Sequence, residues 1–208
     1  FNMAISNALK PVVLPYFSQK NREKEHLGKI YLQATSFLTV FAWPFFAFVG
    51  INSLQVVRLL YGPQWDFSAS LVSIFCVGAV LHFVTIFFDQ LSIATGDSMD
   101  AIKMHGFSLI VLIALLLIFS PYGLTYIAFS LLVIPLIKLI FVGRILIVKL
   151  NVTLIEIVLS IRKSFFVALS VLVTGLLCDD LLNNEVSTFY SLLVYALIAL
   201  LTWLISVF

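Results

Sequence analysis

Charged residues are scarce in this chain. Asp, Glu, Lys and Arg make up 11% of its 208 residues, while 62% of the residues are hydrophobic. A soluble globular domain carries roughly 25% charged residues, because its surface must be hydrated. The shortage of charge therefore excludes a soluble domain and predicts an integral membrane protein. The formal net charge of only +2 gives no sign of a nucleic-acid partner, and we expect none.

Cysteines and catalytic motifs are also few. Cys76 and Cys178 are the only cysteines, and both lie in apolar segments. That placement is typical of small buried side chains and argues against a disulfide framework or a metal pair. No metal-ligand spacing, phosphate-binding loop or dinucleotide fingerprint occurs. We therefore expect no metal, no cofactor, no catalytic residue and no enzymatic activity.

Long apolar runs fill most of the chain. Only helices and closed barrels satisfy backbone polar groups in lipid, and these runs are too long and too uniformly apolar for barrel strands. The sequence predicts an all-α polytopic transmembrane helical bundle of about six spans plus a truncated helix. The expected segments are a helix end at 1–17 that breaks near Pro11 and Pro15, a charged loop at 18–29, four spans within 30–148, an interfacial helix at 149–163, and the last two spans within 164–208.

Lys and Arg are concentrated in alternate connections. They occur in the connections at 18–29, 97–105 and 149–163, whereas the other connections have almost none. By the positive-inside rule these three connections face the cytoplasm. The short amphipathic run 52–62 is then expected at the outer interface, where Arg58 is the exception to the rule.

The apolar run 70–96 carries a polar stripe. Small and polar residues recur there at steps of 4, 3, 4, 3 and 4, which places them on one face if the run is a single helix. Its members are Gly78, His82, Thr85, Asp89, Ser92 and Gly96. A carboxylate at membrane depth must pair, become neutral or meet water, so it marks a pathway or a paired site. We expect Asp89 to couple or gate transport with help from His82. The alternative is that both residues make structural hydrogen bonds between helices.

Two cations and two prolines complete the candidate pathway. Lys138 lies inside the span 124–148, one turn after Pro135. It either faces a cavity or extends its amine to the inner interface. Arg58 is the other cation near the membrane. Pro44 and Pro135 are expected to kink the helices that contain them.

Two stretches resemble the polysaccharide flippases, the bacterial O-antigen and exopolysaccharide translocases. ALKPVVLPYFS at 8–18, followed by a charged loop, is similar to that family's helix end with a proline, an aromatic and a serine. The second stretch runs from FAWPFFAFVGINSLQVVRLLYGPQW at 41–65 through the striped run to its end, DQLSIATGD at 89–97. It is similar to the family's proline-bearing helix, its amphipathic end with a following tryptophan, and its helix closing in a small residue and glycine. The resemblance covers roughly residues 1–105 by motif and the remainder by hydropathy. The superfamily also holds multidrug exporters and lipid II flippases.

The resemblance implies the C-terminal lobe of a longer, two-lobed transporter in the bacterial cytoplasmic membrane. Its cargo would be an oligosaccharide on undecaprenyl diphosphate, moved by alternating access. Lys138 and Arg58 would attract the diphosphate. Titration of Asp89 and His82 would make H⁺ or Na⁺ the coupling ion, and other polysaccharide assembly proteins are expected partners.

Other functions remain open. A multidrug or small-molecule antiporter of the same superfamily would take cationic or apolar cargo, and Asp89 would then matter more than Lys138. A membrane-bound glycosyltransferase or ligase would need extramembrane loops with acid, base or metal groups, which the short loops here do not supply. A purely structural subunit would not need the stripe that contains His82 and Asp89.

Overall fold

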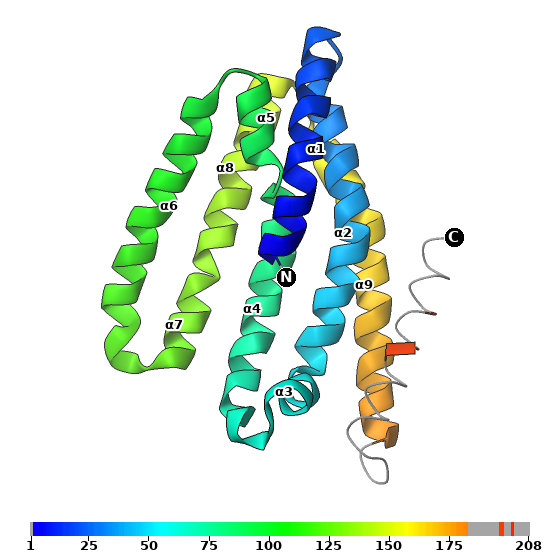
Figure 1. The fold of residues 1–208 in the computed structure, drawn as a ribbon, viewed down its shortest axis with the longest axis vertical. Helices are drawn as coiled ribbons and strands as arrows, with labels where there is room; N and C mark the ends of the chain where they lie inside the picture. The colour runs from blue at the N-terminus through cyan, green and yellow to red at the C-terminus, as the bar shows by residue number, and fades with distance from the viewer. Residues whose placement is uncertain (1, 183–195, 198–200, 202–208) are drawn as a thin grey trace.

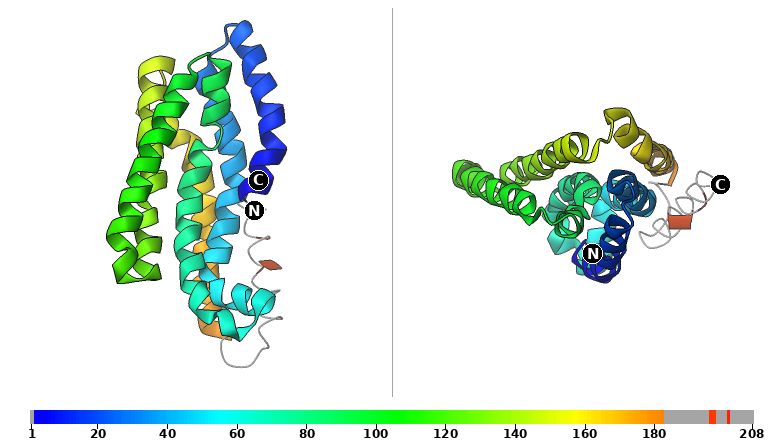
Figure 2. Two further views of the ribbon diagram at one scale, coloured as in Figure 1. Left: turned by 60° about the vertical axis from the view of Figure 1, so that its left-hand side comes forward. Right: turned by 90° about the horizontal axis from the view of Figure 1, so that it is seen from above.

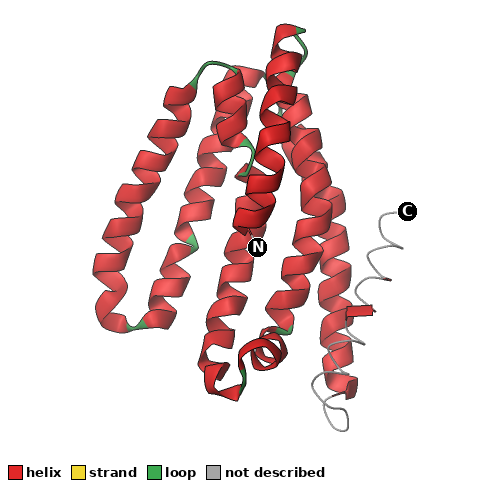
Figure 3. Ribbon diagram, in the orientation of Figure 1, coloured by secondary structure: helices red, strands yellow, loops and turns green. Residues whose placement is uncertain are grey.

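The structure is a bundle of helices. A computed structural model describes residues 2–182, 196–197 and 201, and all regular structure within them is helical (Figure 3). The helices are α1 (Asn2–Arg22), α2 (Leu27–Ile51), α3 (Ser53–Tyr61), α4 (Asp66–Thr85), α5 (Phe88–Ala94), α6 (Ser98–Phe119), α7 (Leu124–Leu131), α8 (Val133–Leu150) and α9 (Leu154–Leu182), with 3₁₀ turns at Pro63–Trp65 and Ser120–Tyr122. The predicted all-α bundle is confirmed.

Five stretches of the described chain are long and apolar enough to cross a membrane. They are Leu27–Ile51, Pro63–Ala94, Ser98–Tyr122, Leu124–Leu150 and Leu154–Gly175. They correspond to the four spans predicted within 30–148 and to the first of the two predicted within 164–208. The last predicted span, 189–208, falls almost entirely outside the described residues. The chain therefore has the architecture of a multi-pass membrane protein.

Helices α2 and α4 form the centre of the bundle. Helix α2 packs along α9 on one side and along α4 on the other, while α1 crosses α5 (Figures 1 and 2). The fully buried aromatic side chains come from these helices and include Phe17, Tyr31, Phe83 and Phe88. Helices α6, α7 and α8 form a hairpin at the side of the bundle, which we call the α6–α8 hairpin. It buries few of its side chains, so most of its apolar surface is available to lipid or to another protein.

The three basic connections lie at one end of the bundle. The links between α1 and α2, between α5 and α6, and between α8 and α9 gather there, whereas α3 and the turn Ser120–Tyr122 lie at the opposite end (Figure 1). We call the first end the basic end. Lys149 joins two of its connections, because its Nζ lies 2.8 Å from Asp97 Oδ2 and 2.5 Å from Asp100 Oδ2. The three basic connections therefore lie at the same end of the bundle, as an alternating topology requires.

This arrangement makes the topology testable. Single cysteines replacing Lys24 at the basic end and Gln64 at the opposite end are both at exposed positions. With the basic end in the cytoplasm, Lys24→Cys is expected to resist a membrane-impermeant thiol reagent in intact cells, whereas Gln64→Cys is labelled. Permeabilised cells serve as the control, because both positions should react there. Equal labelling of the two positions in intact cells would contradict the assigned orientation.

Helix α1 corrects the first predicted boundary. The break expected near Pro11 and Pro15 is absent, and the helix continues to Arg22. Residues 23–26 alone connect it to α2, so much of the predicted loop 18–29 is helical. The two prolines are four residues apart on one exposed face. Each removes one backbone hydrogen bond on that outer side, and the helix tolerates both without ending.

Helix α9 corrects a second boundary. A separate interfacial helix at 149–163 was predicted, but Leu154–Leu182 forms one continuous helix. Thr153 and Glu156 begin it with a reciprocal cap: Thr153 N donates to Glu156 Oε2 (2.8 Å) and Glu156 N donates to Thr153 Oγ1 (3.2 Å). Further along, the buried hydroxyl of Ser164 hydrogen-bonds that of Thr39 (2.8 Å). Thr153 and Glu156 thus cap α9, and Ser164 faces α2.

The two kink prolines lie in different settings. Pro44 lies within the continuous helix α2. Pro135 is the third residue of α8, and the helix is interrupted at Leu132, three residues before it. Proline lacks the N–H that would bond the carbonyl of Leu131 and its ring crowds that carbonyl, which accounts for an interruption at this point.

Gly28 allows the start of α2 to approach the connection between α8 and α9. A Cβ at this position would overlap the side chain of buried Val152 and lie 3.2 Å from Leu150 Cβ. We expect Gly28→Ala to destabilise the protein by about 1–3 kcal/mol through overpacking. Gly106→Ala is the matched control, since a Cβ there meets nothing within 4 Å, and helix propensity favours alanine by about 0.5–1 kcal/mol. Thermal unfolding in detergent measures both, and equal stability of the two variants would contradict the close approach.

Candidate functional site: a titratable cluster at an interrupted span

The span Pro63–Ala94 is interrupted beside its polar residues. Helix α4 ends at Thr85 and α5 begins at Phe88, so the stripe predicted for 70–96 does not lie on one continuous helix. Residues 79–95, around the interruption, contain no proline or glycine. The Thr85 hydroxyl donates to the His82 carbonyl oxygen (3.0 Å), and the Tyr31 hydroxyl of α2 donates to the Val84 carbonyl oxygen (2.8 Å). Side chains thus bond carbonyls at the interruption, as irregular backbone at membrane depth requires.

The Tyr31 hydrogen bond gives a prediction. Its side chain is 1% exposed, so no water replaces its hydroxyl at the Val84 carbonyl. We expect Tyr31→Phe to lower the free energy of unfolding by about 1–3 kcal/mol, the usual effect of leaving a buried acceptor unpaired. Tyr126→Phe is the control, because Tyr126 is 59% exposed and its hydroxyl bonds to no described residue. If thermal unfolding in detergent shows the same midpoint for both variants, the tyrosine does not stabilise the interruption.

Asp89 pairs with His105, which was not among the predicted site residues. Its Oδ1 lies 2.8 Å from Nε2 of His105, and the two side chains are 34% and 48% exposed. His105 was assigned to a loop at 97–105, but α6 begins at Ser98, which corrects that assignment and places His105 on the second turn of a helix. The pair joins α5 to α6. It is a hydrogen bond when the imidazole is neutral and an ion pair when it is protonated.

His82 and Lys138 line one cavity. It has a volume of about 420 Å³ and lies between α4, α6 and the interruption between α7 and α8. Gly78 of α4 lies close to that interruption, since a Cβ there would be 3.2 Å from Leu132 Cδ2. The cavity is lined by Phe75, Gly78, Ala79, His82, Leu112, Leu131, Leu132, Ile134, Pro135 and Lys138. Two titratable side chains 56 positions apart (82 and 138) thus share an otherwise apolar cavity.

Electrostatics link Lys138 to the pair. The carboxylate of Asp89 attracts the half-buried ammonium group of Lys138. Asp89 therefore pairs directly with His105 on α6 and attracts Lys138 on α8 from beyond ion-pair distance. His82, Asp89, His105 and Lys138 together form what we call the titratable cluster. They come from four helices in three spans, two of which are interrupted, and such a cluster within spans is a candidate pathway or coupling site.

The other predicted site residues lie elsewhere. Ser92 is 3% exposed and lines a separate cavity of about 170 Å³ at the basic end, together with Asp97, Asp100 and Lys149. Thr85 is buried, with its hydroxyl bonded to backbone as described above. Neither lines the cavity of His82 and Lys138.

Arg58 is paired at the opposite end of the bundle. Its Nε and Nη2 donate to the two carboxylate oxygens of Asp66, at 2.9 and 2.7 Å. This hydrogen-bonded carboxylate raises the pKa of the Arg58 guanidinium. Because α3 lies at the end away from the titratable cluster (Figure 1), the structure does not bring Arg58 together with Lys138. Among the described residues, no three His, Cys, Asp or Glu side chains are grouped so as to hold a metal ion.

The comparisons with known proteins concern the first third of the chain. Residues 2–70, from α1 to the start of α4, match the family model described as "Polysaccharide biosynthesis protein". No curated protein and no solved structure matches the chain. The family match and the span-length helices fit a membrane protein of polysaccharide export. The titratable cluster lies outside the matched residues.

Proposed function

We propose that this chain is part of a transporter that moves a lipid-linked oligosaccharide across the bacterial cytoplasmic membrane for polysaccharide biosynthesis. The match at residues 2–70 supports the cellular process, and the multi-pass bundle supports transport. The observation that carries the proposal is the titratable cluster beside two interrupted spans. In this proposal the chain is one lobe of a two-lobed protein that works by alternating access.

The cluster contains groups for both cargo and coupling. In our proposal Lys138 attracts the diphosphate of an undecaprenyl carrier, because a cation in an apolar cavity favours an anionic partner. Asp89 and His82 exchange H⁺, or hold Na⁺, as the cavity opens to alternate sides. His105 then acts as the second partner of Asp89. Other polysaccharide assembly proteins supply the loaded carrier and use it after transport.

A cation-coupled antiporter for small molecules is the second candidate. The Asp89–His105 pair favours this second candidate, because a carboxylate that can bind either a proton or a cation suits the exchange of cationic cargo for H⁺. The two candidates differ in which charge they require. Cationic cargo depends on the carboxylate and gains nothing from Lys138, whereas diphosphate cargo needs the lysine.

The proposed function is tested by complementation. The full-length protein is expressed in a strain of the source bacterium that lacks its gene, and surface polysaccharide is measured together with lipid-linked oligosaccharide retained on the cytoplasmic leaflet. The proposal expects surface polysaccharide to be restored and the retained intermediate to disappear. Unchanged polysaccharide in the deletion strain, together with altered drug accumulation, would favour the antiporter instead.

A further inference from the structure

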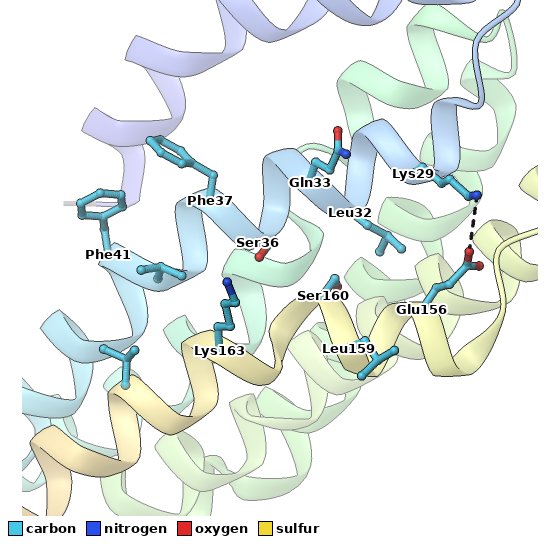
Figure 4. A pocket seen from close by; sticks show the side chains of 12 residues that line it. Lys29, Leu32, Gln33, Ser36, Phe37, Phe41, Glu156, Leu159, Ser160 and Lys163 are labelled. Atoms are coloured by element: carbon cyan, nitrogen blue, oxygen red, sulfur yellow. Dashed lines mark ion pairs between the residues drawn. The ribbon is translucent and has the colours of Figure 1, made fainter. Parts of the chain in front are cut away.

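A second polar site lies in a groove between α2 and α9. This α2–α9 groove has a volume of about 620 Å³ and is lined by residues of those two helices (Figure 4). Its polar part is formed by Lys29, Gln33 and Ser36 of α2 with Ser160 and Lys163 of α9. None of these residues belongs to the titratable cluster, so the groove is a separate feature of the bundle.

The charges of the groove are not balanced. Lys29 Nζ lies 3.9 Å from Glu156 Oε1, at the limit of an ion pair, while Oε2 of the same carboxylate caps the start of α9. Lys163 makes no ion pair with the residues that the structure describes, although it lies within the span Leu154–Gly175. The groove thus contains two cations and one carboxylate, and that carboxylate also caps α9. This excess of positive charge favours the binding of an anion.

Hydrogen-bond donors gather around the second lysine. The Lys163 amine points towards Ser36, with Gln33 one turn away on the same helix (Figure 4). Within the described part of the chain, neither the Gln33 amide nor the Ser36 hydroxyl makes a side-chain hydrogen bond. The ammonium group of Lys163 and the hydroxyl of Ser36 can therefore both donate to the oxygens of one phosphate group.

The groove becomes apolar away from the basic end. Phe37 and Phe41 line it there, are 72% and 48% exposed, and pack edge to face with ring centroids 5.3 Å apart. Both helices are long and apolar enough to cross a membrane, which places this part of the groove at the depth of the lipid hydrocarbon. Along the groove, a cationic part is followed by an aromatic part. A ligand with an anionic headgroup and an attached apolar chain fits this order.

We propose that the α2–α9 groove binds an anionic phospholipid of the leaflet at the basic end, with its phosphate at Lys163 and Ser36, the rest of its headgroup towards Lys29, and an acyl chain along Phe37 and Phe41. Charge complementarity identifies the occupant: a zwitterionic lipid would bring its own cation to the two lysines. The location within two spans favours a lipid over a soluble phosphate. The bound lipid bridges α2 and α9 and stabilises their packing. This proposal does not depend on the cargo of the transporter.

The test uses the purified full-length protein in detergent. Phosphatidylglycerol, phosphatidylethanolamine and inorganic phosphate are added separately, thermal unfolding is followed, and retained lipid is counted by native mass spectrometry. We expect phosphatidylglycerol to raise the unfolding midpoint and the other two to have little effect. The double variant Lys29→Gln/Lys163→Gln should bind phosphatidylglycerol about 25-fold more weakly, at roughly 1 kcal/mol for each basic residue near a lipid surface. Arg162→Gln is the matched control, because Arg162 is exposed and adjacent but does not line the groove.

Three outcomes would overturn the proposal. An equal loss of affinity in Arg162→Gln would show general surface attraction, and an equal gain of stability from phosphatidylethanolamine or inorganic phosphate would show no anionic-lipid site. Absence of retained lipid together with an efficient disulfide cross-link between Phe41→Cys and Leu197→Cys would show that the chain itself covers the groove. Normal unfolding midpoints of the variants without lipid establish that the comparison is made on folded protein.

Discussion

Asp89→Asn is expected to reduce polysaccharide export by roughly 10–100-fold while the protein reaches the membrane at the wild-type level. His105 Nε2 lies 2.8 Å from Asp89 Oδ1. Asparagine has the size of aspartate and keeps an oxygen that can accept this hydrogen bond, but it carries no charge. A loss of export of this size corresponds to about 1.4–2.8 kcal/mol. We attribute it to the missing charge in coupling, because the exposed pair with His105 by itself contributes only about 0–1 kcal/mol. Complementation of an export-deficient strain, normalised to membrane protein, measures the effect.

Asp66→Asn is the control for this experiment. Asp66 is also paired, with Arg58, and its side chain is about as exposed as that of Asp89 (36% and 34%), but this pair lies at the opposite end of the bundle, away from the cavity of His82 and Lys138. Exposed ion pairs contribute about 0–1 kcal/mol, so this variant should export normally. Our coupling hypothesis is wrong if Asp89→Asn exports normally across a range of pH while Asp89→Leu fails to accumulate, because Asp89 would then act only through structural hydrogen bonding.

Lys138→Ala is expected to reduce export about tenfold or more, and Lys138→Arg to retain part of the activity, at similar protein levels. Lys138 is half-buried in the cavity that it shares with His82. Among the described residues that line this cavity it is the only lysine or arginine, so a bound diphosphate would depend on it. A charge-assisted hydrogen bond to a phosphate is lost in the alanine variant and partly kept by arginine. Export and the amount of retained lipid-linked intermediate are measured together.

Lys103→Ala controls for the loss of a positive charge. Lys103 is exposed on α6, lines no part of the cavity and makes no ion pair within the described residues. Full export by Lys138→Ala would show that Lys138 serves only to extend its amine towards the membrane surface. Equal defects in the two variants would show that the cavity has no special role.

The spans were predictable because each is a local property of the chain. Backbone groups in lipid must bond within a helix, so an apolar run of sufficient length determines a spanning helix without reference to its neighbours. The placement of Lys and Arg likewise anticipated that three connections share one end. His82 and Lys138 were each selected from their own spans, but only the fold shows that they line the same cavity.

The interruption after Thr85 was not predictable from local sequence. No proline or glycine marks it, and the Tyr31 hydroxyl that bonds the Val84 carbonyl comes from 53 positions earlier in the chain (84 and 31). His105 was missed for a different reason, since it was assigned to a loop when α6 in fact begins at Ser98. An earlier helix start, signalled by the polar residues Asp97 and Ser98 before an apolar run, would have identified it as a partner for Asp89.

The ion pairs of Lys149 have a mechanical consequence. They join the last turn of α8 to the residues where α6 begins, and the turn Ser120–Tyr122 joins the other ends of α6 and α7. The α6–α8 hairpin is thus joined at both of its ends. The cavity of His82 and Lys138 lies between this hairpin and α4. If the protein works by alternating access, as we propose, we expect this cavity to open by movement of the whole α6–α8 hairpin against α4 and not by separation of α6 from α8.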